Sequence, residues 1–231
     1  DPEAKNILPL IPAPRELAAV KPRNKEQHFA LDALLDERIR LVTIIGKAGT
    51  GKTLLAVAAG LYATLERKQY RKLLVSRPTL PMGKDIGYLP GSIEEKLNPW
   101  MQPIFDALDL LLGDNRDGRR PADLLDGKDP RVAIEPLTFI RGRSIHHQFM
   151  IVDEAQNLTP LEVKTIITRV GHGTKIILTG DIYQIDNPYV DSTSNGLSRA
   201  VNQFRWHGIA AHISLRKGVR SELAELAANI L

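Results

Sequence analysis

The fold of this chain is decided by Gly46-Lys47-Ala48-Gly49-Thr50-Gly51-Lys52-Thr53. This stretch matches the pattern G-x-x-x-x-G-K-[ST], in which glycines let backbone N–H groups close around phosphates at the start of a helix. Residues 41–45 (LVTII) before it form a strand-like aliphatic run, and residues 52–65 after it are rich in Ala and Leu and contain no Pro. The order strand, glycine-rich turn and helix predicts a phosphate-binding loop and disfavours a chance match.

The residue types in this loop predict how it would bind a nucleoside triphosphate. Backbone N–H groups would surround the phosphates, the Lys52 ammonium would reach the β- and γ-phosphates, and the Thr53 hydroxyl would hold Mg²⁺. ATP and Mg²⁺ are therefore the expected cofactors, and Lys52 is also a predicted catalytic residue. The predicted nucleotide-binding residues of the loop are Gly46, Ala48, Gly49, Thr50, Gly51, Lys52 and Thr53.

Two carboxylates follow a second buried strand. Residues 149–152 (FMIV) are apolar, and Asp153 and Glu154 come directly after them. Ligands of open α/β sheets bind at the carboxyl ends of the strands, so both side chains are expected near the phosphates. Asp153 suits the Mg²⁺ shell, and Glu154 suits activation of the attacking water. Alone, such a pair more often begins a solvated helix, but together with the phosphate-binding loop it favours catalysis.

A third polar cluster, Asp181 and Gln184, follows the predicted strand 175–178 (KIIL). Asp181 is predicted to lie at the nucleotide, and Gln184 to position the attacking water or to report loss of the γ-phosphate. Ordinary turn chemistry is the alternative for both residues. Gln27, upstream of the first strand, is a candidate for hydrogen bonding the adenine edge, with a simple surface glutamine as its alternative.

Apolar strands alternate with helical segments along the chain, which predicts an α/β fold with a mostly parallel sheet and helices on both faces. A capping box, Thr159 and Glu162 with Pro160 between them, predicts the start of one helix. Residues 113–130, rich in Asp, Arg, Gly and Lys, are predicted to form a solvated, moving loop. The predicted strands are residues 41–45, 73–76, 132–134, 149–152, 175–178 and 209–213, and the predicted helices are residues 28–35, 52–65 and 160–170.

Composition is that of a globular protein with one sizeable domain, because 43% of the 231 residues are hydrophobic and 25% are charged. Five prolines mark residues 1–22 as a linker or N-terminal extension, which leaves residues 23–231 as the ATPase domain. The start at Asp1 instead of Met leads us to expect a fragment. The chain has no Cys, which excludes disulfides and thiolate metal sites and favours the cytoplasm. Its apolar runs are strand-sized, so no membrane segment is expected.

At residues 46–53, 149–156 and 180–184 the sequence resembles the PhoH family of RecA-like P-loop ATPases, and these motifs are also similar to those of superfamily-one helicases. The resemblance extends to Ser76-Arg77-Pro78 and residues 87–91 (GYLPG), and it covers nearly all of residues 24–231. Residues 187–189 (NPY) and 195–198 (NGLS) look more like the long PhoH form, whose members carry an N-terminal PIN ribonuclease domain. The chain is therefore expected to be the C-terminal PhoH domain of such a protein.

The resemblance implies an ATP-dependent RNA helicase or RNA-remodelling ATPase that acts on single-stranded RNA and feeds the attached nuclease. It also implies a homo-oligomer, expected to be a hexameric ring, because this chain has room for only one RecA-like lobe. An arginine from one subunit would then reach the ATP of the next, with Arg220 the first candidate and Arg216 the second. The candidate nucleic-acid contacts are Arg77, Lys84, Arg141, Arg143 and His146.

Two alternatives to a motor remain open. In the first, ATP orders loops and recruits a partner, so that the chain is a nucleotide-dependent switch or scaffold. In the second, the loop serves a small-molecule kinase. The carboxylates Asp153 and Glu154, together with Gln184, favour water as the phosphate acceptor and so disfavour the kinase.

Overall fold

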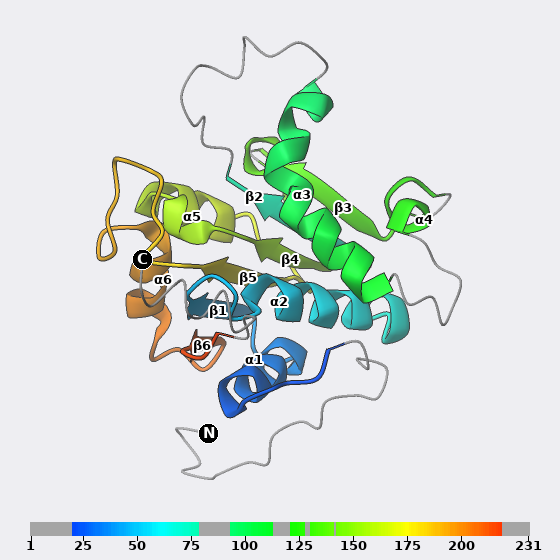
Figure 1. Cartoon of the computed structure of the whole chain (residues 1–231). Helices are drawn as coiled ribbons and strands as arrows, with labels where there is room; N and C mark the ends of the chain where they lie inside the picture. Colours follow the sequence, from blue (N-terminus) through cyan, green and yellow to red (C-terminus); the bar gives the residue numbers. More distant parts are fainter. Residues whose placement is uncertain (1–19, 79–92, 113–120, 128–129, 141, 219–231) are drawn as a thin grey trace.

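A computed structural model of the chain describes residues 20–78, 93–112, 121–127, 130–140 and 142–218. These residues form one sheet of six strands in the order β3-β2-β4-β5-β1-β6 (Figure 1), and all the strand pairs are parallel. Each of the six predicted strands is present, which confirms the expected RecA-like α/β class. The strands are β1 (Leu41–Gly46), β2 (Lys72–Arg77), β3 (Val132–Pro136), β4 (Gln148–Val152), β5 (Lys175–Gly180) and β6 (Ala210–Leu215).

Helices cover both faces of the sheet because the inner strands are apolar on both sides. Successive residues of a strand point to opposite faces. In β4, Phe149 and Ile151 pack into the core that contains α1, α2 and α3, whereas Met150 and Val152 pack into the core that contains α5 and α6. The helices are α1 (Lys25–Leu35), α2 (Lys52–Leu61, continued by the π-helical turn Tyr62–Glu66), α3 (Ile93–Leu112), α4 (Pro121–Asp126), α5 (Pro160–Ile167) and α6 (Gly196–Phe204).

Three helices, α3, α4 and α6, lie where the sequence predicted none. The long helix α3 contains Pro99 and Pro103, and its later turns pack on the core through Met101, Ile104 and Leu108, which are spaced as one helix face. Helix α4 lies within the stretch predicted as a solvated loop, and there the prediction was wrong. Burial of Leu124 against the α2 side of the sheet stabilises this short helix in a largely polar segment.

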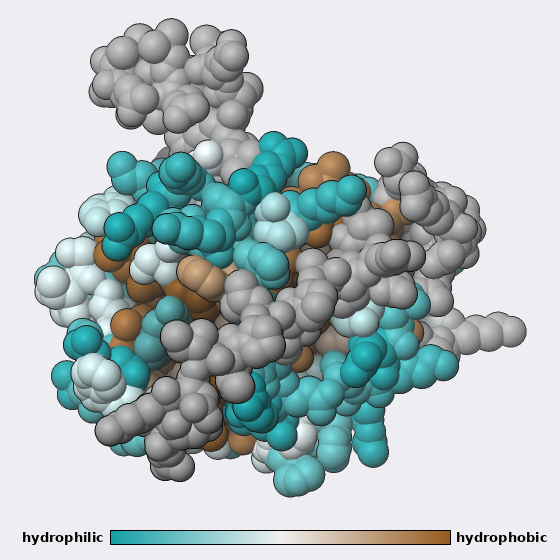
Figure 2. Space-filling view, turned by 90° about the horizontal axis from the view of Figure 1, so that it is seen from below, coloured by the Kyte–Doolittle hydropathy of each residue, from teal (hydrophilic) through white to brown (hydrophobic). Residues whose placement is uncertain are grey.

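The face of the molecule that carries α1 is mainly polar. On the side where α1 lies, hydrophilic residues occupy most of the described surface, and apolar residues gather toward its middle (Figure 2). None of the described helices has the length and apolar composition needed to cross a lipid bilayer. The most exposed large apolar side chains include Trp206 and Tyr189, and scattered exposure of this kind is normal for a globular domain.

Lys175 joins the start of β5 to the end of α1. Its Nζ donates to the carbonyl oxygens of Ala33 at 2.7 Å and Asp36 at 2.8 Å, where the last carbonyls of a helix have no partner within the helix. The side chain is only 1% exposed. Burial lowers the pKa of Lys175 from 10.5 to about 7.

We expect this buried lysine to make stability rise with pH above neutrality. The penalty of burying its charge is fully present below pH 7 and is relieved as pH rises toward 10.5, because the unfolded chain still binds the proton that the folded chain has lost. The free energy of unfolding should gain up to about 1.4 kcal/mol per pH unit in this window. Urea unfolding of the wild type and Lys175→Met between pH 7 and 9 measures the difference, and a pH-independent difference would contradict the lowered pKa.

Candidate nucleotide-binding site

The predicted phosphate-binding loop connects β1 to α2 where the carboxyl ends of the parallel strands lie. This side of the sheet is called the carboxyl edge below, and the side where the strands begin is called the amino edge. Gly49 and Gly51 have φ values of 78° and 89°, in the left-handed region that favours glycine. Gly46 has no room for a side chain, since a Cβ there would lie 2.7 Å from Thr50 Oγ1 and 2.8 Å from Leu215 O. The loop shape therefore requires glycine at these three positions.

Lys52 lies inside the loop. Its Nζ donates to the carbonyl oxygens of Gly46 at 2.6 Å and Lys47 at 3.1 Å, and its side chain is buried. Phosphate oxygens are stronger, charged acceptors than carbonyl oxygens. The ammonium is thus placed where an entering phosphate would replace its present partners, although its contact with nucleotide stays a prediction.

Asp181 contacts the same loop from the end of β5. Its Oδ2 accepts from the backbone N–H of Ala48 at 3.0 Å, and its Oδ1 accepts from the N–H of Tyr183 at 3.0 Å. The structure therefore brings this predicted nucleotide-binding residue to the phosphate-binding loop. The second contact closes the turn that leads to Gln184, whose side chain is exposed.

Asp153 and Thr53 form a pair of oxygen ligands suited to Mg²⁺. The Thr53 hydroxyl donates to Asp153 Oδ1 at 2.9 Å, and the Thr179 hydroxyl donates to the same oxygen at 2.5 Å. Mg²⁺ prefers such hard oxygens and in nucleotide sites usually takes one or two carboxylates together with phosphates and waters. The residues present thus fit the ion, which when bound would neutralise charge on the phosphates. Sequence analysis assigned no role to Thr179, which fixes the carboxylate from the next strand.

Glu154 has an unusual backbone and two side-chain partners. Its φ of 54° and ψ of 36° lie in the left-handed region, which is strained for a residue with a Cβ and occurs often at functional sites. Its Oε1 lies 3.2 Å from the Arg77 guanidinium, and its Oε2 accepts from Gln156 Nε2 at 2.5 Å. The carboxylate is about one third exposed, so water can reach it.

Gln156 is a functional candidate that sequence analysis missed. Its side chain is fully buried, and besides Glu154 it contacts two residues of the segment that follows β5. Its Nε2 donates to Gln184 O at 2.9 Å, and its Oε1 accepts from Asp181 N at 3.1 Å. Gly180 allows this approach, because a Cβ there would lie 2.5 Å from Gln156 Oε1. The sequence offered only a glutamine two positions after Glu154 as a signal.

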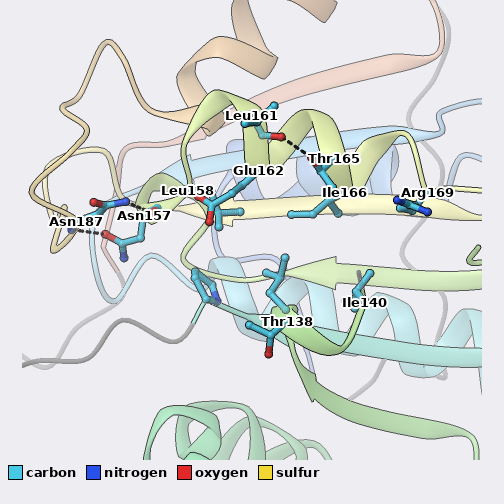
Figure 3. Close-up of a pocket in the computed structure, with 12 residues that line it drawn as sticks. Thr138, Ile140, Asn157, Leu158, Leu161, Glu162, Thr165, Ile166, Arg169 and Asn187 are labelled. Atoms are coloured by element: carbon cyan, nitrogen blue, oxygen red, sulfur yellow. Dashed lines mark hydrogen bonds between the residues drawn. The ribbon is translucent and has the colours of Figure 1, made fainter. Parts of the chain in front are cut away.

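The next residue adds a second link between the segments that follow β4 and β5. Asn157 Oδ1 accepts from Asp186 N at 2.8 Å. Asn187 Nδ2 donates to Asn157 O at 2.8 Å, as the contact between these two asparagines in Figure 3 shows. Both asparagines line a pocket of about 430 Å³. Helix α5 forms one wall and the 3₁₀ turn Leu137–Ile140 contributes another (Figure 3). The pocket is lined by Pro78, Leu137, Thr138, Ile140, Asn157, Leu158, Leu161, Glu162, Thr165, Ile166, Arg169 and Asn187.

Gln27 is buried and is no surface glutamine. Its Nε2 donates to Thr50 O at 3.0 Å, and its Oε1 accepts from Arg23 N at 2.8 Å. Asn24 caps α1 by accepting from Gln27 N at 2.9 Å, which fixes the residue at the start of the helix. Gln27 therefore braces the phosphate-binding loop, and hydrogen bonding to adenine stays a prediction.

Of the two arginines predicted to reach the ATP of a neighbouring subunit, the structure describes only Arg216. Arg216 is exposed and directly follows β6, where Leu215 pairs with Gly46 of the phosphate-binding loop. It therefore lies at the same edge of the sheet as the nucleotide site. Arg220 lies outside the described residues, and action across a subunit contact stays a prediction for both arginines.

The five candidate nucleic-acid contacts do not share one location. Arg77 and Arg143 lie at the carboxyl edge and pair with Glu154 and Glu135. His146 lies two residues before β4 and packs beside Gly171, so it lies at the opposite, amino edge, away from the nucleotide site, and its contact with nucleic acid stays a prediction. Strands β3 and β4 both run parallel to β2, so the chain must return from the carboxyl end of β3 to the amino edge before β4 begins. Lys84 and Arg141 lie outside the described residues.

Comparisons with known proteins agree on one family. A family model described as PhoH-like protein matches residues 19–231. Protein PhoH2 of Bacillus subtilis (strain 168) is 57% identical over 212 residues, which are 92% of this chain and 48% of that protein. Protein PhoH2 of Mycolicibacterium smegmatis is 43% identical over 231 residues, which are 99% of this chain and 51% of that protein. The chain thus spans about half the length of these relatives.

Two solved structures of helicase or ATPase proteins are similar to this chain at a low level. The Pif1 helicase from Candida albicans has a TM-score of 0.45 and 16% identity, with 91% of this chain and 43% of that chain covered. The Sulfolobus solfataricus SWI2/SNF2 ATPase core in complex with dsDNA has a TM-score of 0.46 and 13% identity, with 84% of this chain and 45% of that chain covered. Similarity at this level carries no information on substrate.

Proposed function

The chain belongs to the PhoH family, and on this premise we propose that it hydrolyses ATP and couples the hydrolysis to binding and remodelling or unwinding of single-stranded RNA. One observation carries the proposal. Gln156 connects Glu154, the candidate base, to Asp181, which contacts the phosphate-binding loop. Loss of the γ-phosphate can therefore change the position of the segment that follows β5 through these direct contacts.

The hydrolysis step uses the residues at the carboxyl edge. Water attacks the γ-phosphorus of ATP, Glu154 accepts the proton of that water, and the bond to the β-phosphate oxygen breaks to give ADP and phosphate. Lys52 offsets the negative charge that develops on the phosphates. Asp181 holds the loop from the other side through Ala48 N.

Coupling to RNA is supported by charge and by position. The chain has a net charge of +4, and Arg77 lies at the nucleotide edge with part of its side chain exposed. A homo-oligomer, with Arg216 or Arg220 acting on a neighbour's ATP, would supply the second lobe that a motor needs. An N-terminal PIN ribonuclease domain in a longer protein would agree with the half-length match to the relatives.

The test is ATP hydrolysis by the purified chain with Mg²⁺, with single-stranded RNA, with single-stranded DNA of the same sequence, and with neither. We expect RNA to raise the turnover rate, and the stimulation to fall as salt is raised, because phosphate contacts release counterions. Glu154→Gln serves as the control for contaminating ATPases. Slow turnover that neither nucleic acid changes would instead support a nucleotide-dependent switch or scaffold.

A further inference from the structure

Both carboxylate oxygens of Glu154 are already engaged. Oε1 lies 3.2 Å from the Arg77 guanidinium, and Oε2 accepts from Gln156 at 2.5 Å. The oxygen that faces the Arg77 guanidinium is occupied by a protein donor and not by the attacking water, whereas the other oxygen is fixed in place by the buried Gln156 amide. The Arg77 contact therefore competes with an attacking water for Glu154.

The contact with Arg77 is built by neighbouring strands. Strands β2 and β4 pair side by side, with Ser76 opposite Val152, and Asp153 N donates to Ser76 O at 2.9 Å. The second guanidinium nitrogen of Arg77 donates to Trp100 O of α3 at 3.1 Å. Arg77 is thus directed across the edge of the sheet onto Glu154 and is held there from its other side.

The two partners of Glu154 differ in how easily they can be displaced. Gln156 is fully buried and has further partners on the segment after β5, so it is a fixed support. Arg77 is 19% exposed, and a guanidinium binds phosphate oxygens in a bidentate manner. Arg77 is therefore the contact that an approaching phosphate group can replace.

We propose that Arg77 is a positioning residue that restrains Glu154, and that a backbone phosphate of single-stranded nucleic acid releases the restraint by binding Arg77. The release step rests on the proposed function, whereas the restraint concerns ATP hydrolysis alone. The pocket offers a route, because Pro78, next to Arg77, and Asn157, three residues after Glu154, both line it. In this proposal the strand lies across the pocket, so that one of its backbone phosphates reaches Arg77.

The experiment compares steady-state ATP hydrolysis, without nucleic acid, by the wild type, Arg77→Met, Arg77→Lys and Arg38→Met. Arg38 is the matched control, since it is an exposed arginine paired with Asp36 away from the site. We expect Arg77→Met to raise the basal kcat several-fold without changing KM for ATP. Arg77→Lys, which keeps a cation, should have an intermediate rate, and Arg38→Met should equal the wild type.

An unchanged or lower basal kcat in Arg77→Met overturns the restraint, and so does a loss of ATP affinity, which would place Arg77 among the nucleotide-binding residues. Thermal unfolding checks that the variant folds; if it does not, the intermediate rate of Arg77→Lys is the test. Single-stranded RNA should stimulate the wild type but not Arg77→Met. If RNA and DNA leave the wild type unchanged while Arg77→Met is faster, RNA coupling and the release step fail, and the restraint stands.

Discussion

Replacing Glu154 with Gln will leave ATP binding intact and slow hydrolysis by about 100-fold or more, which is the usual size of a general-base contribution. The amide has the same shape but cannot take a proton from water, and because only one of its two polar atoms is an acceptor it keeps only one of the two contacts with Arg77 and Gln156. Single-turnover hydrolysis measures the rate, and titration with a fluorescent ATP analogue measures the affinity. Glu37→Gln is the matched control, because Glu37 is exposed and contacts Gln69 far from the loop.

Lys52→Ala will lose ATP binding, whereas Glu154→Gln keeps ATP binding and loses hydrolysis. Its Nζ lies within the loop, 2.6 Å from Gly46 O, and its loss removes the positive charge that phosphates require there. We expect ATP affinity to fall strongly in this variant and to stay near the wild-type value in Glu154→Gln. If both variants lost ATP affinity equally, Glu154 would be a binding residue and the assignment as base would be wrong.

Replacing Gln156 with Met will lower both stability and turnover. Methionine has a similar length but no amide, so Asp181 N loses its acceptor in a buried environment. An unsatisfied buried N–H costs about 1–3 kcal/mol of the free energy of unfolding. Glu154 and the segment after β5 also lose their common support, and misplacement of catalytic groups by a fraction of an ångström to 1 Å lowers kcat by about 10-fold to 100-fold.

Urea unfolding and steady-state hydrolysis measure the two effects of Gln156→Met separately. Gln102→Met is the matched control, since Gln102 is exposed on α3 and pairs only locally with Asp106. A Gln156→Met protein with wild-type stability and wild-type kcat would show that the buried amide supports neither the fold nor the site.

Much of the site followed from the sequence because polar residues come directly after buried strands. In a parallel sheet all carboxyl ends lie at one edge, so Asp153 and Asp181 were expected beside the phosphate-binding loop, and they contact its residues Thr53 and Ala48. The glycines of the loop were predictable for the same local reason, since the positive φ of Gly49 and Gly51 is a property of a short segment.

Contacts between polar side chains could not be predicted in this way. The amide of Gln156 gains its partners only because β4 and β5 are neighbours in the sheet, and Arg77 reaches Glu154 only because β2 lies on the other side of β4. Likewise Lys175 finds the end of α1 across 139 positions of sequence. No local pattern contains this information.

The sequence by itself determined the strands, the phosphate-binding loop and the edge at which the catalytic groups gather, because apolar runs and glycine-dependent backbone conformations are local properties. Only the tertiary structure decided which polar side chains hold Glu154, where α3 and α4 pack, and that His146 lies at the far edge. The physical reason is that a buried polar group takes whichever donor or acceptor the folded neighbours place within reach, and those neighbours come from distant parts of the chain.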